Sequence, residues 1–220
     1  MKKFDLLPEI QSIHPEGIAE GERCGKPFNV LLGLPRHWQV EDLVNACERR
    51  WQPARVDIWY NLDLQGIAVV TPSVTRILIG ATTEIALELK KPVVLTNVQR
   101  FASESLETEA WHVKSPPFWI VDEDGEAHVV GRISRSLLRI LAVMDELETA
   151  CALSIASANS QSAPSKKEVG NVSVYLNNLF NAGLVGREKC NAVHRDNAER
   201  GWTYTYRSGS SLALRSLMSH

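Results

Sequence analysis

Hydrophobic and polar positions follow two alternating patterns between residues 27 and 105. Short apolar runs, rich in branched and aromatic side chains, are typical of buried strands. Between these runs, apolar residues recur at intervals of three and four, which is typical of helices with one buried face. This order predicts an α/β domain, a mixed sheet with helices that cover one face. The predicted strands are 28–34, 55–62, 67–70 and 92–98, and the predicted helices are 39–51 and 73–89.

The pattern changes on both sides of this segment. Residues 1–26 show weak periodicity and hold several prolines and glycines, so we expect an arm with at most one short strand. Residues 101–117 are polar and end in two prolines, as in a helix fragment or a loop. Residues 118–133 have the pattern of a hairpin around an Asp-Gly pair. We therefore expect a linker and β-hairpin at 106–133, with a domain boundary in this region.

From Ser134 onward the period is helical again. Three helices are expected, followed by two strands that are joined by a polar loop. Gly183 stands where a left-handed cap would end the third helix. This order predicts a second, α+β domain over residues 134–220. The expected helices are 134–147, 149–157 and 166–182, the strands begin at Leu184 and Trp202, and a last short helix is expected at 212–217.

The composition is that of an ordinary globular protein. The chain has 220 residues, of which 44% are hydrophobic and 23% charged, enough for one large domain or two small ones. No apolar run approaches the roughly 20 residues that span a bilayer, and the first residues lack the apolar core of a secretory signal. The 4 cysteines lie far apart, which favours reduced thiols in a cytosolic protein over zinc ligands.

The net charge of −2 hides a difference between the two halves. Residues 1–132 hold 14 basic and 19 acidic residues, a net charge of −5. Residues 133–220 hold 10 basic and 7 acidic residues, a net charge of +3. Unequal halves favour two domains with different partners, although a difference of this size also arises by chance.

The carboxyl-terminal half resembles bacterial winged-helix regulators over about residues 134–208. Three helices followed by a two-stranded hairpin is their arrangement, and residues 172–189 resemble their recognition helix and first wing strand. In that pattern Leu176 and Leu179 anchor the helix to the core, and Gly183 permits its left-handed cap. The resemblance implies a winged helix-turn-helix domain that binds double-stranded DNA.

In such a domain the amino-terminal end of the third helix enters the major groove. Lysines contact phosphates as charges, while asparagine and serine reach base edges. The loop between the strands is suited to phosphate or minor-groove contacts. The alternative is that the lysines are a solvated helix start and that the domain binds protein. The predicted DNA-binding residues are Ser165, Lys166, Lys167, Asn171 and Ser173 in the helix, and His194, Arg195 and Arg200 in the loop.

The amino-terminal half resembles the STAS domain, the fold of anti-sigma-factor antagonists, over about residues 27–105. That family runs Asp-Leu-Ser-Gly-Val, then three residues, then a serine-containing turn that opens a helix. Asp63, Leu64, Gly66 and Ile67 match the first part at the right spacing, and Ser73 falls at the helix-opening serine. The resemblance implies a mixed sheet with helices that binds a protein partner, a second copy or a ligand.

Ser73 is the candidate regulatory residue. Many STAS domains carry Asp-Ser-Ser-Gly at this turn, and a partner kinase phosphorylates one of the serines. This chain has Thr71-Pro72-Ser73-Val74, without the acid and the glycine. A helix amino terminus would still favour a phosphate, but the simplest role of the serine is a cap worth about 1 kcal/mol. Ser73 or Thr71 could be the cap of the following helix, and we predict that Ser73 caps it.

The sequence offers no familiar catalytic motif. It has no P-loop, GxGxxG, GxSxG or HExxH, and its 6 histidines are scattered without metal-ligand spacing. The acidic run at 122–126 lacks the remaining ligands of a calcium loop and fits a hairpin turn better. We therefore expect a protein that is not an enzyme and takes no metal or cofactor. A Rossmann-like site near 71–75 is the enzymatic alternative.

These patterns together predict a cytoplasmic DNA-binding transcription regulator without membrane association. The STAS-like domain would bind its partner, and the winged helix would bind DNA within a homodimer. The alternative is a non-catalytic adaptor in a larger complex, in which the winged helix binds protein. One continuous basic face of Lys166, Lys167, Arg195 and Arg200 would favour the regulator, and interruption by Glu168, Asp196 and Glu199 would favour the adaptor.

Overall fold

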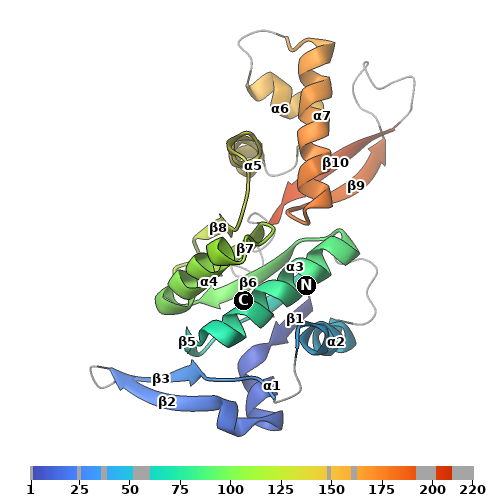
Figure 1. The fold of residues 1–220 in the computed structure, drawn as a ribbon. Helices are drawn as coiled ribbons and strands as arrows, with labels where there is room; N and C mark the ends of the chain where they lie inside the picture. The colour runs from blue at the N-terminus through green and yellow to red at the C-terminus, as the bar shows by residue number, and fades with distance from the viewer. Residues whose placement is uncertain are drawn as a thin grey trace.

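The computed structural model describes residues 2–23, 26–35, 39–51, 60–147, 150–159, 163–191 and 202–209. Over these residues the protein is a mixed α/β structure, as predicted. Figure 1 shows an elongated arrangement, with residues 6–31 at one end, a central sheet in the middle and the carboxyl-terminal helices at the other end.

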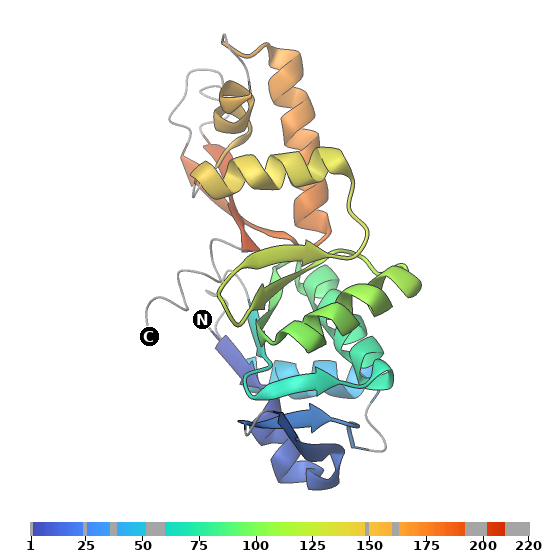
Figure 2. The ribbon, with the colours of Figure 1, turned by 90° about the vertical axis from the view of Figure 1, so that its left-hand side faces the viewer.

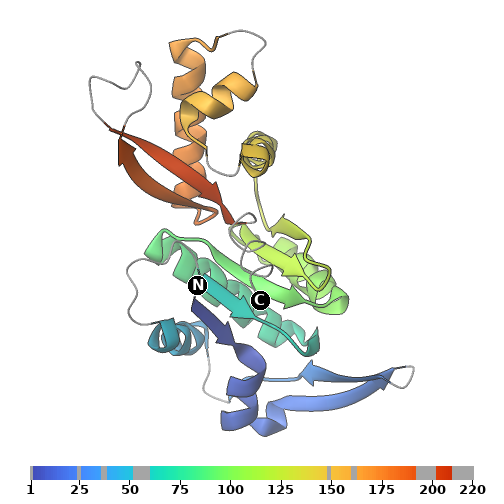
Figure 3. The same ribbon diagram turned by 180° about the vertical axis from the view of Figure 1, so that it is seen from behind.

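A five-stranded sheet forms the centre, and its strands in spatial order are β1 (Lys2–Asp5), β4 (Tyr60–Asp63), β6 (Val93–Val98), β7 (Phe118–Asp122) and β8 (Ala127–Val130). The first four are parallel, and β8 is antiparallel to β7. Because the parallel strands lie in chain order, connections of one hand place their helices on the same face. Figure 3 shows the strands in front of these helices, which are α2 (Val40–Trp51), α3 (Pro72–Leu89) and α4 (Arg100–His112).

Alternate residues of β6 and β7 point to opposite faces of this sheet, and both sets are apolar. Leu95, Phe118 and Ile120 pack in a first core with α2, α3 and α4. Val94 and Trp119 face the other way and belong to a second core. Strands that are apolar on both faces need a covering layer on each side. The second core supplies the covering layer on the face that the helices α2–α4 leave free.

The elements of the second core are α5 (Arg135–Leu147), α6 (Ala152–Ala158), α7 (Lys166–Asn181), β9 (Val185–Asn191) and β10 (Trp202–Ser208). The two strands pair as an antiparallel hairpin. Figure 2 shows α5 running across α7 rather than alongside it. Ala150, between α5 and α6, exchanges two backbone hydrogen bonds with Tyr206 of β10, of 3.0 and 2.8 Å. The predicted order of three helices and two strands is confirmed, with the second helix beginning three residues later than expected, and the last helix predicted at 212–217 lies outside the described residues.

The carboxyl-terminal end of α7 lies against the central sheet. The indole Nε1 of Trp119 donates a 2.8 Å hydrogen bond to the carbonyl of Leu184. Gly183 has a φ of +71° and ends α7 as predicted. The amides of Gly183 and Leu184 bond the carbonyls of Phe180 and Leu179, which makes a complete Schellman motif. A Cβ on Gly183 would lie 2.6 Å from the Cβ of Ala86, so α3 also touches this helix end.

Residues 2–23 are folded, where the sequence pattern predicted an arm. β1 pairs with β4, and Leu6 and Ile10 of α1 (Leu6–Ile13) are fully buried. After a 3-10 turn at Pro15–Gly17, β2 (Ile18–Arg23) starts a three-stranded sheet. Its partners are β3 (Lys26–Leu31), which pairs antiparallel with β2, and β5 (Ile67–Val70), which pairs parallel with β3. Of the prolines and glycines that suggested an arm, Pro15 and Gly17 lie in the 3-10 turn, whereas Pro8 lies in the first turn of α1 and Gly21 lies within β2.

Residues 106–133 are an integral part of the central sheet, where the pattern predicted a linker and hairpin. The hairpin of β7 and β8 is present, but β7 also pairs with β6 inside the sheet. The polar segment before it is the regular helix α4, whose Ala102, Leu106 and Ala110 are fully buried at intervals of four. The exposed glutamates of this helix made the segment resemble a loop.

The prediction that Ser73 caps α3 is wrong. The cap position belongs to Thr71, and Ser73 is the second residue of the helix after Pro72, which favours the first helical position. The Thr71 hydroxyl does not cap an amide but donates a 2.9 Å hydrogen bond to the carbonyl of Leu32. The backbone carbonyl of Thr71 accepts from the amide and the hydroxyl of Thr75. Ser73 is exposed, so its hydroxyl adds little to the fold.

The left-handed end of α7 leads to a prediction with a built-in control. Gly183→Ala should lower the free energy of unfolding by at least about 1 kcal/mol, since an L side chain is strained at positive φ and meets Ala86. Gly170→Ala, inside the same helix and in open space, should raise it by about 0.5–1 kcal/mol. Urea unfolding of both variants measures this, and equal effects would contradict the assigned helix end.

A second pair of variants tests the start of α3. Thr71→Val should lower the free energy of unfolding by about 1 kcal/mol, because the hydroxyl that joins α3 to the end of β3 is lost. Ser73→Ala should change it by less than about 0.5 kcal/mol, as expected of an exposed side chain. The opposite order of effects in thermal or urea unfolding would restore Ser73 as the cap.

Candidate functional site

The amino-terminal end of α7 is closed by a capping box. The Ser165 Oγ accepts a 3.3 Å hydrogen bond from the Glu168 amide, and the Glu168 carboxylate accepts 2.7 Å bonds from the Ser165 amide and hydroxyl. These bonds to Ser165 lower the pKa of the fully exposed Glu168. The Ser165 hydroxyl is therefore already bonded within the capping box. Glu168 adds a negative charge at the end of α7 where phosphate contacts were predicted.

The predicted DNA-binding residues of α7 are all exposed but lie on different sides of the helix. Val172, Leu176 and Leu179 are buried and define the core side. At about 100° per residue, Lys167 lies on the opposite, outermost side, with Asn171 about 40° from it. Lys166 and Ser173 lie on the flank that faces the hairpin. The Ser173 hydroxyl donates a 3.0 Å bond to the Val169 carbonyl of the same helix.

The outermost side of α7 holds residues that sequence reasoning missed. Val174 is 58% exposed although it is apolar, and Asn178 follows it one turn later. A Cβ on Gly170 would meet no neighbour among the described residues, so none of them packs on the helix at this position. Helical periodicity alone would have found these residues, since they share a side with Lys167. This side of the helix is free to meet a partner.

Two further basic residues lie on the hairpin. The Arg187 guanidinium lies 3.8 Å from the ring centre of Phe180 and 4.3 Å from that of Tyr204. The Lys189 ammonium lies 4.5 Å from the ring centre of Trp202. The alternation of Trp202, Tyr204 and Tyr206 along the predicted strand is the signal that could have found this aromatic face, although not the cations upon it. The loop residues His194, Arg195 and Arg200 lie outside the described residues, as do Asp196 and Glu199.

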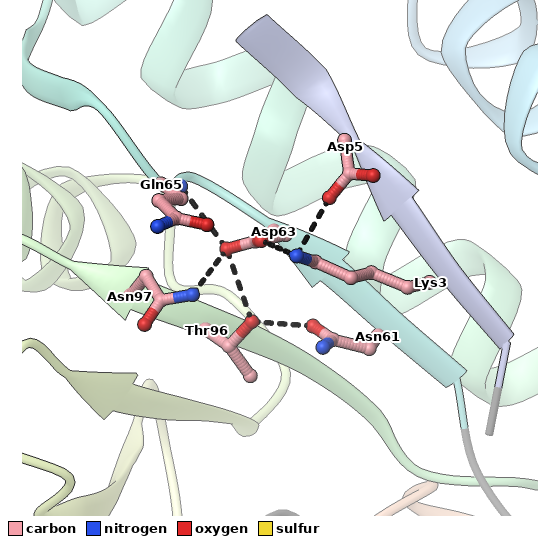
Figure 4. A network of polar contacts seen from close by, with 7 residues as sticks. All are labelled: Lys3, Asp5, Asn61, Asp63, Gln65, Thr96 and Asn97. Carbon is pink, nitrogen blue, oxygen red and sulfur yellow. Dashed lines mark hydrogen bonds and ion pairs between the residues drawn. The ribbon is translucent and has the colours of Figure 1, made fainter. Parts of the chain in front are cut away.

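A second candidate site is a polar network at the carboxyl ends of β1, β4 and β6 (Figure 4). The Lys3 ammonium forms ion pairs with the carboxylates of Asp5, at 2.8 Å, and Asp63. The other oxygen of Asp63 accepts from the side-chain amide of Asn97 at 2.7 Å. Thr96 donates a 2.6 Å bond to Asn61. Asn61, Asp63 and Thr96 are almost completely buried.

This network satisfies its own members and holds β1 on the sheet. In open α/β sheets ligands often bind outside the carboxyl ends of parallel strands. Here, however, the ammonium of Lys3 already neutralises the buried carboxylate of Asp63. Partial burial alone would lower the pKa of Lys3, but its hydrogen bonds to Asp5 and Asp63 raise it. Asp63, the first residue of the STAS-like motif, thus has a structural role.

A groove lies beside the start of α3. It has a volume of about 420 Å³ and runs between β5, the first turn of α3 and α4. Val69, Pro72 and the half-exposed Phe101 make its apolar part. Glu109, which is 7% exposed and paired with Arg76 at 2.5 Å, makes an acidic part. The candidate regulatory residue Ser73 follows the lining residue Pro72 in the chain but is not itself a lining residue of the groove.

Within the described residues, no group of three or more histidine, cysteine, aspartate or glutamate side chains is placed to hold a metal ion. In the same part of the chain, no helix has both the length and the apolar character needed to cross a bilayer. The chain matches no protein-family model, no curated protein and no solved structure.

The Lys3 network leads to a prediction of alkaline sensitivity. A lysine whose pKa is raised in the folded protein stabilises it below the ordinary pKa of 10.5, and this contribution is lost as the pH rises through the raised value. Lys3→Met should be less stable than wild type near neutral pH, because Asp63 loses its counter-ion.

The difference in stability between Lys3→Met and wild type should shrink above about pH 10.5. Tyr206, whose pKa is raised by burial, is present in both proteins, so its own alkaline titration cancels in the comparison. Urea unfolding across this pH range measures the difference. A constant difference at every pH would contradict the ion pair.

Proposed function

We propose that the protein is a DNA-binding regulator that contacts duplex DNA with α7 and the hairpin β9–β10. The observation that carries the proposal is the exposed amino end of α7, with Lys167 and Asn171 towards its outer side and Lys166 on the flank that faces the hairpin. Lysines at this place reach phosphates, and asparagine presents the donor and acceptor that pair with adenine in the major groove.

The arrangement around α7 supports the proposal that the carboxyl-terminal half is a winged-helix domain. Three helices precede an antiparallel hairpin, and the bridge between Ala150 and Tyr206 ties the start of α6 to the second strand. α6 packs against α7, the order in which a helix-turn-helix presents its second helix to DNA (Figure 1). The Schellman end at Gly183 and the Trp119 bond give α7 a fixed base on the central sheet. A rigidly held helix is what groove recognition requires.

For the amino-terminal half we propose partner binding at the groove beside α3. Apolar Val69, Pro72 and Phe101 next to the Arg76–Glu109 pair are a mixture typical of protein interfaces. A second copy, as in a homodimer, is one such partner. Binding there would reach α7 through α3, since Ala86 lies against Gly183. The function that we propose involves no catalysis.

The adaptor remains the second candidate, and two observations favour it. Glu168 places an ionised carboxylate at the start of α7, which repels phosphate. Val174, 58% exposed on the outer side, is a typical protein contact. The net charge of the carboxyl-terminal half is only +3, so the proposal requires a modest number of phosphate contacts.

A salt-dependent DNA titration tests the proposal. Wild type should bind a labelled duplex with an affinity that falls with salt, measured by fluorescence anisotropy between about 50 and 200 mM salt. Lys166→Ala with Lys167→Ala should weaken binding and flatten the slope of log K against log salt by about two.

The matched control removes two positive charges from the other half of the chain. Lys90→Asn with Arg100→Gln alters exposed residues, and asparagine tolerates the left-handed backbone of Lys90. This control should keep the wild-type slope. An unchanged slope in a folded Lys166/Lys167 variant would contradict the proposed interface. Absence of DNA binding by wild type at about 50 mM salt would favour the adaptor.

A further inference from the structure

A separate cleft lies inside the carboxyl-terminal half, between α6, α7 and β10. Its volume is about 220 Å³. One wall is aromatic and the other is formed by small and aliphatic side chains (Figure 3 shows the three elements). The described lining residues are Ala152 and Leu153 of α6, Val169 and Ser173 of α7, and Trp202, Thr203, Tyr204 and Tyr206 of β10.

The aromatic wall is a row of side chains on one face of β10. Trp202 and Tyr204 pack edge to face, with ring centres 5.1 Å apart, and Tyr204 and Tyr206 do so at 6.4 Å. Tyr206 is buried in the core, whereas Trp202 and Tyr204 are only half-buried. The row therefore begins in the core and continues into the cleft, where ring faces and edges remain partly open to solvent. Such a wall suits a flat apolar ligand.

Among the described residues, the charged side chains on the aromatic face of the hairpin are basic. None of the described lining residues is acidic. Arg187 and Lys189 alternate with the aromatic residues on the same face of the hairpin, opposite Tyr206 and Tyr204. The nearest acidic neighbour on β9, Glu188, pairs with Thr205 and so lies on the other face, where Arg207 is 3.8 Å away. Neither cation is among the described lining residues, but Arg187 lies over the ring of Tyr204 and Lys189 over that of Trp202, so both lie beside the aromatic wall.

We propose that this cleft binds a small planar aromatic anion. The rings of Trp202 and Tyr204 would flank its flat part, and Leu153 and Val169 would close the opposite side. Lys189, whose ammonium lies over Trp202, would meet the negative group. The volume is below the roughly 300–1,000 Å³ of sites for drug-sized ligands, which limits the occupant to one or two fused rings.

The ligand would touch both α7 and the hairpin, the two elements assigned to DNA. The binding claim itself is independent of the proposed function, because it concerns occupancy of the cleft alone. Two natural sources share the required chemistry, namely an aromatic carboxylate and the base and phosphate of a nucleotide. The test therefore uses 2-naphthoate for the first source and adenosine monophosphate for the second.

Binding is measured by calorimetry and by the indole N–H signals in NMR spectra of the full chain. At least one of the two anions should saturate the wild-type protein in the millimolar range or below and shift a single indole signal, that of Trp202. The signal is assigned with Trp202→Phe. Absence of saturable binding of either anion would overturn the proposal without any variant.

Variants with larger side chains inside the cleft test where the ligand binds. Leu153→Trp and, separately, Ser173→Phe add bulk inside the cleft and should weaken binding at least tenfold, while Thr205→Trp adds the same indole to the outer face of β10 and should leave binding unchanged. Two separate filled variants are used so that one of them still gives a result if the other fails to fold. Equal binding to the filled variants and to wild type would overturn the location.

A separate measurement tests whether the cleft prefers a negatively charged ligand. The neutral analogue 2-naphthylmethanol should bind at least tenfold more weakly than 2-naphthoate, and Lys189→Gln should remove most of this difference. Equal affinity for the neutral and the anionic compound would overturn the anion assignment. DNA binding by wild type is not needed for any of these results, so failure of the DNA titration and failure of the cleft are separate outcomes.

Discussion

Two neighbouring interior strands of the central sheet, β6 and β7, carry apolar side chains on both faces, and this constraint organises the molecule. Leu95 and Phe118 need a cover on one face, while Val94 and Trp119 need one on the other. The helices that connect the parallel strands all lie on the first face, since the strands follow chain order. The second face is left to the carboxyl-terminal half, which packs α5 and the base of the hairpin against it.

The same constraint explains why the base of α7 is so firmly fixed. Trp119 lies on the second face, and its indole nitrogen reaches the Leu184 carbonyl just beyond the helix end. A buried indole nitrogen needs such a partner. Gly183, held at positive φ, brings this carbonyl and α3 close enough for both contacts. The outer side of α7, with Lys167 and Val174, is correspondingly free of packing.

Sequence periodicity predicted the elements whose apolar residues are regular and missed those whose signals were mixed. The helix at 166–182 and its glycine end were predicted because Leu176, Leu179 and Gly183 mark one face and one end. α4 was predicted only as a helix fragment or a loop, because its buried Leu106 is surrounded by glutamates. Strand pairing was not predictable, since the sequence of β7 alone does not indicate that β6 is its partner. For that reason a strand inside the sheet was assigned to a linker.

Candidate site residues could be predicted from the sequence only where they belong to the same helix or strand. Lys166, Lys167 and Asn171 follow from the start of a single helix, whereas the Lys3–Asp63 pair joins residues sixty positions apart in the chain. The aromatic face of β10 follows from alternation, but the cations upon it depend on the register with β9. Ser73 was misassigned because both Thr71 and Ser73 suit a cap, and only the position of Pro72 within the helix separates them.

The placement of Trp119 also determines how this protein can be divided. A fragment that ends before α5 would present Val94 and Trp119 to water on an otherwise folded sheet, and such an apolar patch favours aggregation. The carboxyl-terminal fragment alone would lose the indole that bonds the Leu184 carbonyl. Exchange of either half between proteins would therefore require the new partner to bring a matching sheet face. The two halves are therefore joined by a common apolar layer around Val94 and Trp119, and neither half is a self-contained unit.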